Sequence, residues 1–114
     1  MIKEAYCSFE VARLLKEKGF NEPVTELNKL LFMEGEKPIL KITHQKAMAW
    51  LREEKNIFIV IEPHAYDYVN EKNLSYVYSL WVGDNYYENP SKNGFPSYEE
   101  TVEAALKYSL ENLI

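Results

Sequence analysis

The chain has 114 residues, of which 46% are hydrophobic, and it carries a net charge of −5. This length fits one domain with one hydrophobic core, and the acidic balance disfavours a protein that neutralises the phosphates of a nucleic acid. No apolar run is long enough to span a bilayer and no signal peptide is visible, so we expect a cytoplasmic protein with no membrane partner. The single cysteine, Cys7, excludes an internal disulfide and any zinc site built from several cysteines.

The first predicted element is a helix over residues 8–18. Ser8 is a suitable N-cap, Glu10 lies in the first turn, and Gly19 fits the left-handed position that ends many helices. Residues 21–42 allow two interpretations. They form either two strands joined by a turn at residues 34–38 or a helix followed by one strand, and we favour the two strands.

The most strongly patterned stretch runs from residue 43 to residue 61. Thr43 caps a predicted helix over residues 43–55, and Asn56 can end it because asparagine tolerates the left-handed conformation. The apolar run Ile57–Ile61 follows directly, and its β-branched composition predicts a strand that is buried on both faces. Pro63 is expected to end that strand.

A second strand is predicted over residues 74–82, where the side chains alternate between two faces. One face carries Leu74, Tyr76, Tyr78, Leu80 and Val82, and the other carries Ser75, Val77, Ser79 and Trp81. Antiparallel pairing of residues 57–61 with residues 74–82 is expected to form the centre of the sheet. Turn signals follow at residues 83–85 and 89–94, with Tyr86 and Tyr87 between them.

The last predicted element is a helix over residues 97–113, which opens with a capping box made by Ser97 and Glu100. Lys107 is four residues from both Glu103 and Glu111 and is expected to pair with them. Together the elements predict the α+β fold class. We expect residues 1–114 to form a single compact domain in which an antiparallel β-sheet packs against two or three α-helices.

Residues that often carry chemistry give weak signals in this chain. His64 lies near Glu62 and Asp67, but neither it nor His44 shows the spacing of a metal site. Cys7 precedes a helix N-terminus and has no histidine near it in sequence, so we interpret it as a small buried residue, although the fold can bring a histidine to it. No catalytic, cofactor-binding or metal-binding residue is predicted, no cofactor is expected, and an enzyme is not the favoured interpretation.

Aromatic side chains give the clearest functional signal, because most of the nine tyrosines lie in the second half of the chain. The predicted interaction surface consists of Trp81, Tyr86, Tyr87, Tyr66 and Tyr68. Exposed aromatic side chains are typical of protein interfaces and of sites that stack bases. No Lys/Arg cluster accompanies them, which favours a protein interface over a nucleic-acid site.

Three segments carry a resemblance to known sequences: YCSFEVARLLKEKGF (residues 6–20), THQKAMAWLREEKNI (43–57) and SYEETVEAALKYSLENL (97–113). They are similar to a group of small uncharacterised proteins encoded in genomes and prophage-like regions of gut Bacteroidetes. The resemblance implies a small phage-associated α+β protein. It implies no activity and no site residue.

Three functions from different classes remain as hypotheses. The favoured one is a non-enzymatic, phage-associated accessory or protein-interaction module that self-associates, for example as a homodimer. The alternative is a small nucleic-acid-binding domain that uses Lys41, Lys46, Arg52 and Lys55. The third is a small-ligand binder or an enzyme, with a pocket lined by His64, Asp67 and tyrosines.

Overall fold

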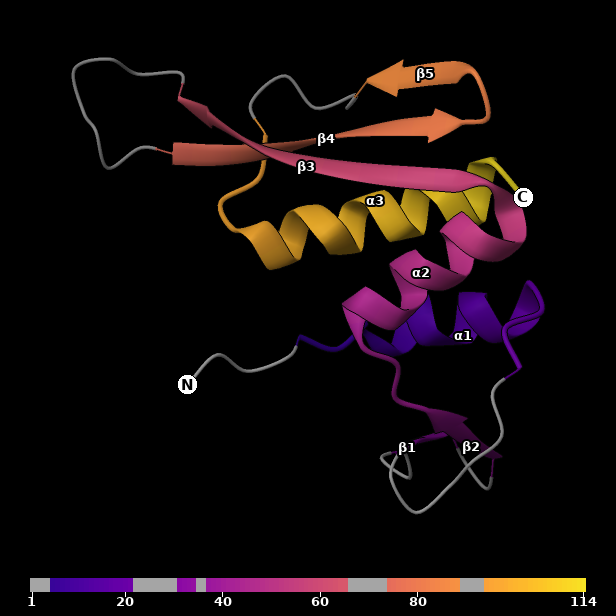
Figure 1. Ribbon diagram of the computed structural model, residues 1–114. Helices are drawn as coiled ribbons and strands as arrows, with labels where there is room; N and C mark the ends of the chain where they lie inside the picture. The colour runs from indigo at the N-terminus through magenta and orange to yellow at the C-terminus, as the bar shows by residue number, and fades with distance from the viewer. Residues whose placement is uncertain (1–4, 22–30, 35–36, 66–73, 89–93) are drawn as a thin grey trace.

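A computed structural model describes residues 5–21, 31–34, 37–65, 74–88 and 94–114. In chain order its elements are α1 (Phe9–Glu17), β1 (Leu31–Glu34), β2 (Lys37–Leu40), α2 (His44–Lys55), β3 (Ile57–Ala65), β4 (Leu74–Val82), β5 (Asn85–Glu88) and α3 (Tyr98–Asn112). Helices packed against an antiparallel sheet confirm the predicted α+β fold class (Figure 1).

The main sheet has the strand order β3-β4-β5 and is antiparallel throughout. The β3-β4 register runs from Ile57 opposite Val82 to Ala65 opposite Leu74, which confirms the predicted centre of the sheet. β5 was not predicted as a strand; a tight turn at residues 83–84 returns the chain so that Asn85 pairs with Val82. β1 and β2 form a separate antiparallel pair, which confirms the favoured hairpin, whereas residues 22–30 and 35–36 of the segment 21–42 lie outside the described residues.

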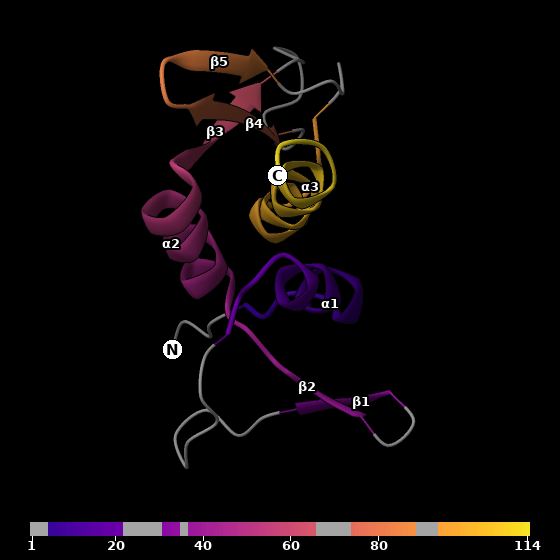
Figure 2. The same ribbon diagram turned by 90° about the vertical axis from the view of Figure 1, so that its right-hand side faces the viewer.

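The helices stack in layers beneath one face of the main sheet. α2 and α3 lie directly under β3 and β4, and α1 packs against α3 on the side away from the sheet (Figures 1 and 2). The β1-β2 pair lies at the far end of the molecule, next to α1. The largest fully buried side chains are Leu15, Leu51, Ile57, Leu80, Leu106 and Leu110. They fill the space between these layers. The opposite face of the main sheet carries no helix among the described elements (Figures 1 and 2).

All three helices begin at the N-caps that the sequence predicts. The side chains of Ser8, Thr43 and Ser97 each accept a hydrogen bond from the backbone N–H three residues further along. Asn56 ends α2 in the left-handed conformation, with a φ of 57°. The turn at Asn56 is tight enough that β3 begins at the next residue and folds back over α2.

Two predictions about β3 are wrong. The strand is not buried on both faces, because Phe58 and Val60 are 41% and 37% exposed on the side away from the helices. Pro63 does not end the strand, which continues to Ala65. Tyr76, opposite Pro63, exchanges its backbone hydrogen bonds with Phe95 and therefore directs them away from β3. Because this pair makes no hydrogen bonds between β3 and β4, the missing N–H of Pro63 costs no bond between the strands.

The predicted ion pairs along α3 are also replaced by contacts between helices. Lys107 Nζ lies 3.2 Å from Glu10 Oε1 of α1, instead of pairing with Glu103. The hydrogen bond and charge of Glu10, with a smaller contribution from the charge of Glu111, raise the pKa of Lys107. Glu103 turns instead toward His44 of α2, a contact described below.

Candidate functional site

Three aromatic side chains cross the outer face of the main sheet, one from each strand. Phe58 of β3 stands opposite Trp81 of β4, and Trp81 stands opposite Tyr86 of β5. Directly paired residues share one face of a sheet, so the three form a continuous line, called here the aromatic row. Their exposed fractions are 41%, 42% and 50%, and the Trp81 and Tyr86 ring centroids are 4.9 Å apart. The row is therefore a packed but solvent-facing apolar surface.

The neighbours of the aromatic row on the same face are small, apolar or acidic. Val60 pairs with Ser79 in the next register position, and Glu62 pairs with Val77 beyond it. Among the side chains of this face that the structure describes, none is basic. The outer face is thus apolar at one end and acidic at the other, which suits contact with another apolar surface and not with phosphate.

The residues of the predicted interaction surface do not all lie on one face of the structure. Trp81 and Tyr86 lie in the aromatic row, but Tyr87 pairs with Leu80 and so points to the helix side of the sheet, where it is 36% exposed. Tyr66 and Tyr68 lie outside the described residues. Phe58 was missed because the run 57–61 was interpreted as buried on both faces. Its register opposite Trp81 is the signal that places it on the outer face.

The basic residues of the nucleic-acid hypothesis do not share a face with the aromatic row. Lys46, Arg52 and Lys55 lie on α2 and Lys41 just before it, and α2 packs on the opposite side of the sheet (Figure 1). Arg52 Nε lies 3.4 Å from Glu53 Oε1, and Lys55 Nζ lies 5.6 Å from the centre of the Trp50 ring. The combination of stacking rings and adjacent cations that single-stranded nucleic acids need is not formed by these residues.

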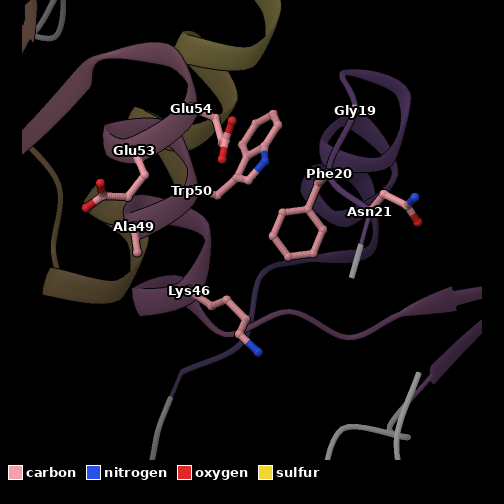
Figure 3. A pocket seen from close by; sticks show the side chains of 8 residues that line it. All are labelled: Gly19, Phe20, Asn21, Lys46, Ala49, Trp50, Glu53 and Glu54. Carbon is pink, nitrogen blue, oxygen red and sulfur yellow. The ribbon is translucent and has the colours of Figure 1, made fainter. Parts of the chain in front are cut away.

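A hollow of about 510 Å³ lies between the end of α1 and the outer side of α2 (Figure 3). Its lining residues are Gly19, Phe20, Asn21, Lys46, Ala49, Trp50, Glu53 and Glu54. Trp50 meets Phe20 edge to face, with ring centroids 5.7 Å apart, which explains its position beside the buried face of α2. The third hypothesis names a pocket lined by His64, Asp67 and tyrosines. The side chain of His64 and all of Asp67 lie outside the described residues.

A second group of side chains that can carry chemistry lies between the helices: Cys7, His44 and Glu103, called here the thiol–imidazole–carboxylate cluster. His44 Nε2 lies 2.9 Å from Glu103 Oε1, and the backbone N–H of Ser8 donates to the same oxygen at 2.7 Å. A carboxylate only accepts hydrogen bonds, so His44 donates here. Cys7 and His44 are 1% and 6% exposed, whereas the Glu103 side chain is 27% exposed.

Backbone pairing before the first two helices brings this cluster together. The Cys7 N–H donates to the Ile42 carbonyl at 2.8 Å, and the His44 N–H donates to the Ala5 carbonyl at 2.9 Å. Cys7 precedes the N-cap of α1 and His44 follows the N-cap of α2, so both side chains enter the core at helix starts. Glu103 reaches them from the second turn of α3. The cluster was not predicted, because its members are distant in the chain.

The protonation states of the cluster limit its chemistry. Burial and the nearby charge of Glu103 raise the pKa of the Cys7 thiol to about 12, so it is not a thiolate at neutral pH. Burial also raises the pKa of Glu103, but the hydrogen bonds from His44 and Ser8 outweigh that effect and hold it below its ordinary value. A buried, protonated thiol is a poor nucleophile, which disfavours a nucleophilic role for Cys7.

No helix within the described ranges has both the length and the apolar character needed to cross a membrane. Comparison of the chain with protein-family models, with curated proteins and with solved structures gives no match.

Proposed function

We propose that this chain is a non-enzymatic interaction module that self-associates, with the outer faces of two copies packed against each other. The observation that carries the proposal is the aromatic row of Phe58, Trp81 and Tyr86, a solvent-facing apolar line on the sheet face that carries no helix among the described elements. A phage-associated accessory role is part of the proposal and rests on the resemblance of residues 6–20, 43–57 and 97–113.

A second copy suits the outer face because the face can pair with itself. Two sheets pack face to face at a separation of about 10 Å, with side chains from both inner faces interdigitating. A two-fold axis between them presents the same patch on both copies. The side chains of Val60 and Ser79 are smaller than those of the aromatic row beside them, so the row of one copy can rest against them in the other.

The size of the apolar surface supports a reversible dimer. A fully accessible aromatic side chain offers about 150–250 Å², so the exposed fractions of the aromatic row leave roughly 200–330 Å² in contact with water. A stable interface buries about 800 Å² per partner, of which the fully buried centre is the most apolar part. The aromatic row therefore supplies the centre of an interface, and the surrounding strand residues would supply its rim.

The net charge of −5 makes the proposed dimerisation sensitive to salt. Two copies of an acidic chain repel each other at long range, and salt screens this repulsion. Dimerisation through an apolar face should therefore strengthen as the ionic strength rises. Binding to a nucleic acid changes in the opposite direction, because salt weakens contacts with phosphate.

Sedimentation velocity from low to high micromolar concentration, at low and at high salt, tests the proposal. We expect a monomer–dimer equilibrium that shifts toward the dimer at high salt. Tyr86→Lys places a charge in the aromatic row and should leave a monomer. Tyr6→Lys is the matched control, because Tyr6 is 42% exposed and lies outside the main sheet, where it pairs with Thr43 just before α2. A wild-type protein that stays monomeric at both salts, or equal dimerisation of the two variants, would overturn the proposal.

A further inference from the structure

The thiol–imidazole–carboxylate cluster has the donor atoms and the spacing of a metal site. One donor atom from each of Cys7, His44 and Glu103 lies within 4.8 Å of the other two. Around a tetrahedral zinc ion, with bonds of about 2.0–2.3 Å, neighbouring donor atoms stand roughly 3.3–3.8 Å apart. Side-chain shifts on the order of 1 Å are enough to bring all three donors onto one ion. We propose that this cluster binds Zn²⁺.

The donor set selects the class of metal. A thiolate sulfur, an imidazole nitrogen and a carboxylate oxygen are the three ligand types that Zn²⁺ takes from proteins. Mg²⁺ and Ca²⁺ prefer sites made only of oxygen, so the sulfur of Cys7 disfavours both. Binding forms a zinc–sulfur bond and releases the thiol proton to solvent. If His44 Nε2 is the ligand atom, the proton that it now donates to Glu103 leaves to solvent and Nδ1 takes up a proton from solvent, so that the imidazole stays neutral.

The surroundings of the cluster support a bound cation. The Ser8 N–H, which donates to Glu103 Oε1 at 2.7 Å, can keep that carboxylate oriented as an outer-shell partner. The 27% exposure of the Glu103 side chain leaves room for water to reach the fourth position of a tetrahedral ion. The cluster lies between the helices, away from the outer face of the sheet, so the zinc proposal does not depend on self-association.

The position of the cluster gives the ion a structural role. Cys7 precedes α1, His44 is the first residue of α2, and Glu103 belongs to α3. A single ion would therefore connect three segments that are far apart in the chain. Metal binding in such a site adds to folding stability, because the unfolded chain does not hold the three donors together.

Titration of the full chain with Co²⁺, after treatment with a chelator, tests the site without any variant. Co²⁺ takes the same tetrahedral ligands as Zn²⁺ and is coloured. We expect one ion per chain, an intense near-ultraviolet sulfur-to-cobalt charge-transfer band, visible bands typical of tetrahedral Co²⁺, and loss of all of them when Zn²⁺ is added. Absence of the charge-transfer band at saturating Co²⁺ would overturn the proposal.

Two substitutions separate this site from weak surface binding. Cys7→Ala should remove the charge-transfer band and weaken Zn²⁺ binding at least a hundredfold in competition with a chromophoric chelator. His64→Asn, which removes the chain's other histidine, should leave both unchanged. Circular dichroism checks that each variant is folded. Equal Zn²⁺ affinity in wild type and Cys7→Ala, or loss of binding in His64→Asn, would assign the metal elsewhere and contradict the proposal.

Discussion

Replacing Glu103 by alanine removes the carboxylate that links the starts of α1 and α2 to α3. The substitution leaves the His44 side chain and the Ser8 N–H without their acceptor, at contacts of 2.9 and 2.7 Å. His44 is 6% exposed, so water cannot fully replace the lost partner. We therefore expect Glu103→Ala to destabilise the protein much more than the loss of a surface carboxylate does.

The magnitude follows from two hydrogen bonds to a charged group. Each such bond contributes about 1.5–3 kcal/mol, so two bonds to a fully buried carboxylate would contribute about 3–6 kcal/mol. The partial exposure of Glu103 and the exposure of Ser8 reduce the expected loss to about 2–3 kcal/mol. For a domain of this size the expected fall in Tm is roughly 8–12 °C.

Thermal and urea unfolding, followed by circular dichroism at neutral pH with a chelator present, measure this effect. Glu111→Ala is the control, because Glu111 is exposed on the same helix and should change stability by less than about 0.5 kcal/mol. If Glu103→Ala unfolds within about 0.5 kcal/mol of the control, the contact between the three helix segments contributes little to stability.

Three further predictions concern single residues. Because the pKa of Glu103 lies below its ordinary value in the folded chain, the stabilisation by its carboxylate should be complete above about pH 4.3 and should disappear as the pH falls through the folded pKa. The free energies of unfolding of wild type and Glu103→Gln, measured in urea, should therefore converge in acid, and a difference that stays constant with pH would contradict this. The Cys7 thiol, with its pKa raised to about 12, should react with an aromatic disulfide reagent at least a hundredfold more slowly in the folded chain than in urea, and comparable rates would show that it is accessible. Gly94→Ala should lower the free energy of unfolding in urea by about 2 kcal/mol or more, because Gly94 has a φ of 73° and an added Cβ would lie 2.8 Å from the Tyr76 carbonyl oxygen and 2.9 Å from Ser75 Oγ. A loss below about 0.5 kcal/mol would show that the backbone adjusts freely.

Features with local causes were predictable from the sequence. The N-caps Ser8, Thr43 and Ser97 depend on residues three positions apart, and all three begin helices in the structure. The alternation along residues 74–82 gave the bounds of β4, because a period of two residues needs no knowledge of the partner strand. The pairing of β3 with β4 followed from their apolar patterns and was also predicted.

Features that depend on pairing across the chain were not predictable in this way. Phe58 and Val60 belong to an uninterrupted apolar run, and only the strand order shows that one face of β3 is open to solvent. β5 is four residues long and lies between two turn signals, so local propensity did not indicate a strand. Cys7, His44 and Glu103 meet because the segment before α1 pairs with the segment before α2, a contact that no local spacing reveals.

The fluorescence of Trp81 reports whether two copies meet at the outer face of the sheet. The chain has two tryptophans, and Trp50→Phe leaves Trp81 as the sole tryptophan, which can be excited selectively over the tyrosines, while keeping an aromatic ring beside Phe20. Trp81 is 42% exposed, so its emission in the monomer should be that of a ring in contact with water. As the concentration rises through the range in which sedimentation shows dimers, we predict a shift of this emission to shorter wavelength, strengthened by salt. An emission maximum that stays constant while dimers form would show that the two copies do not meet at the outer face.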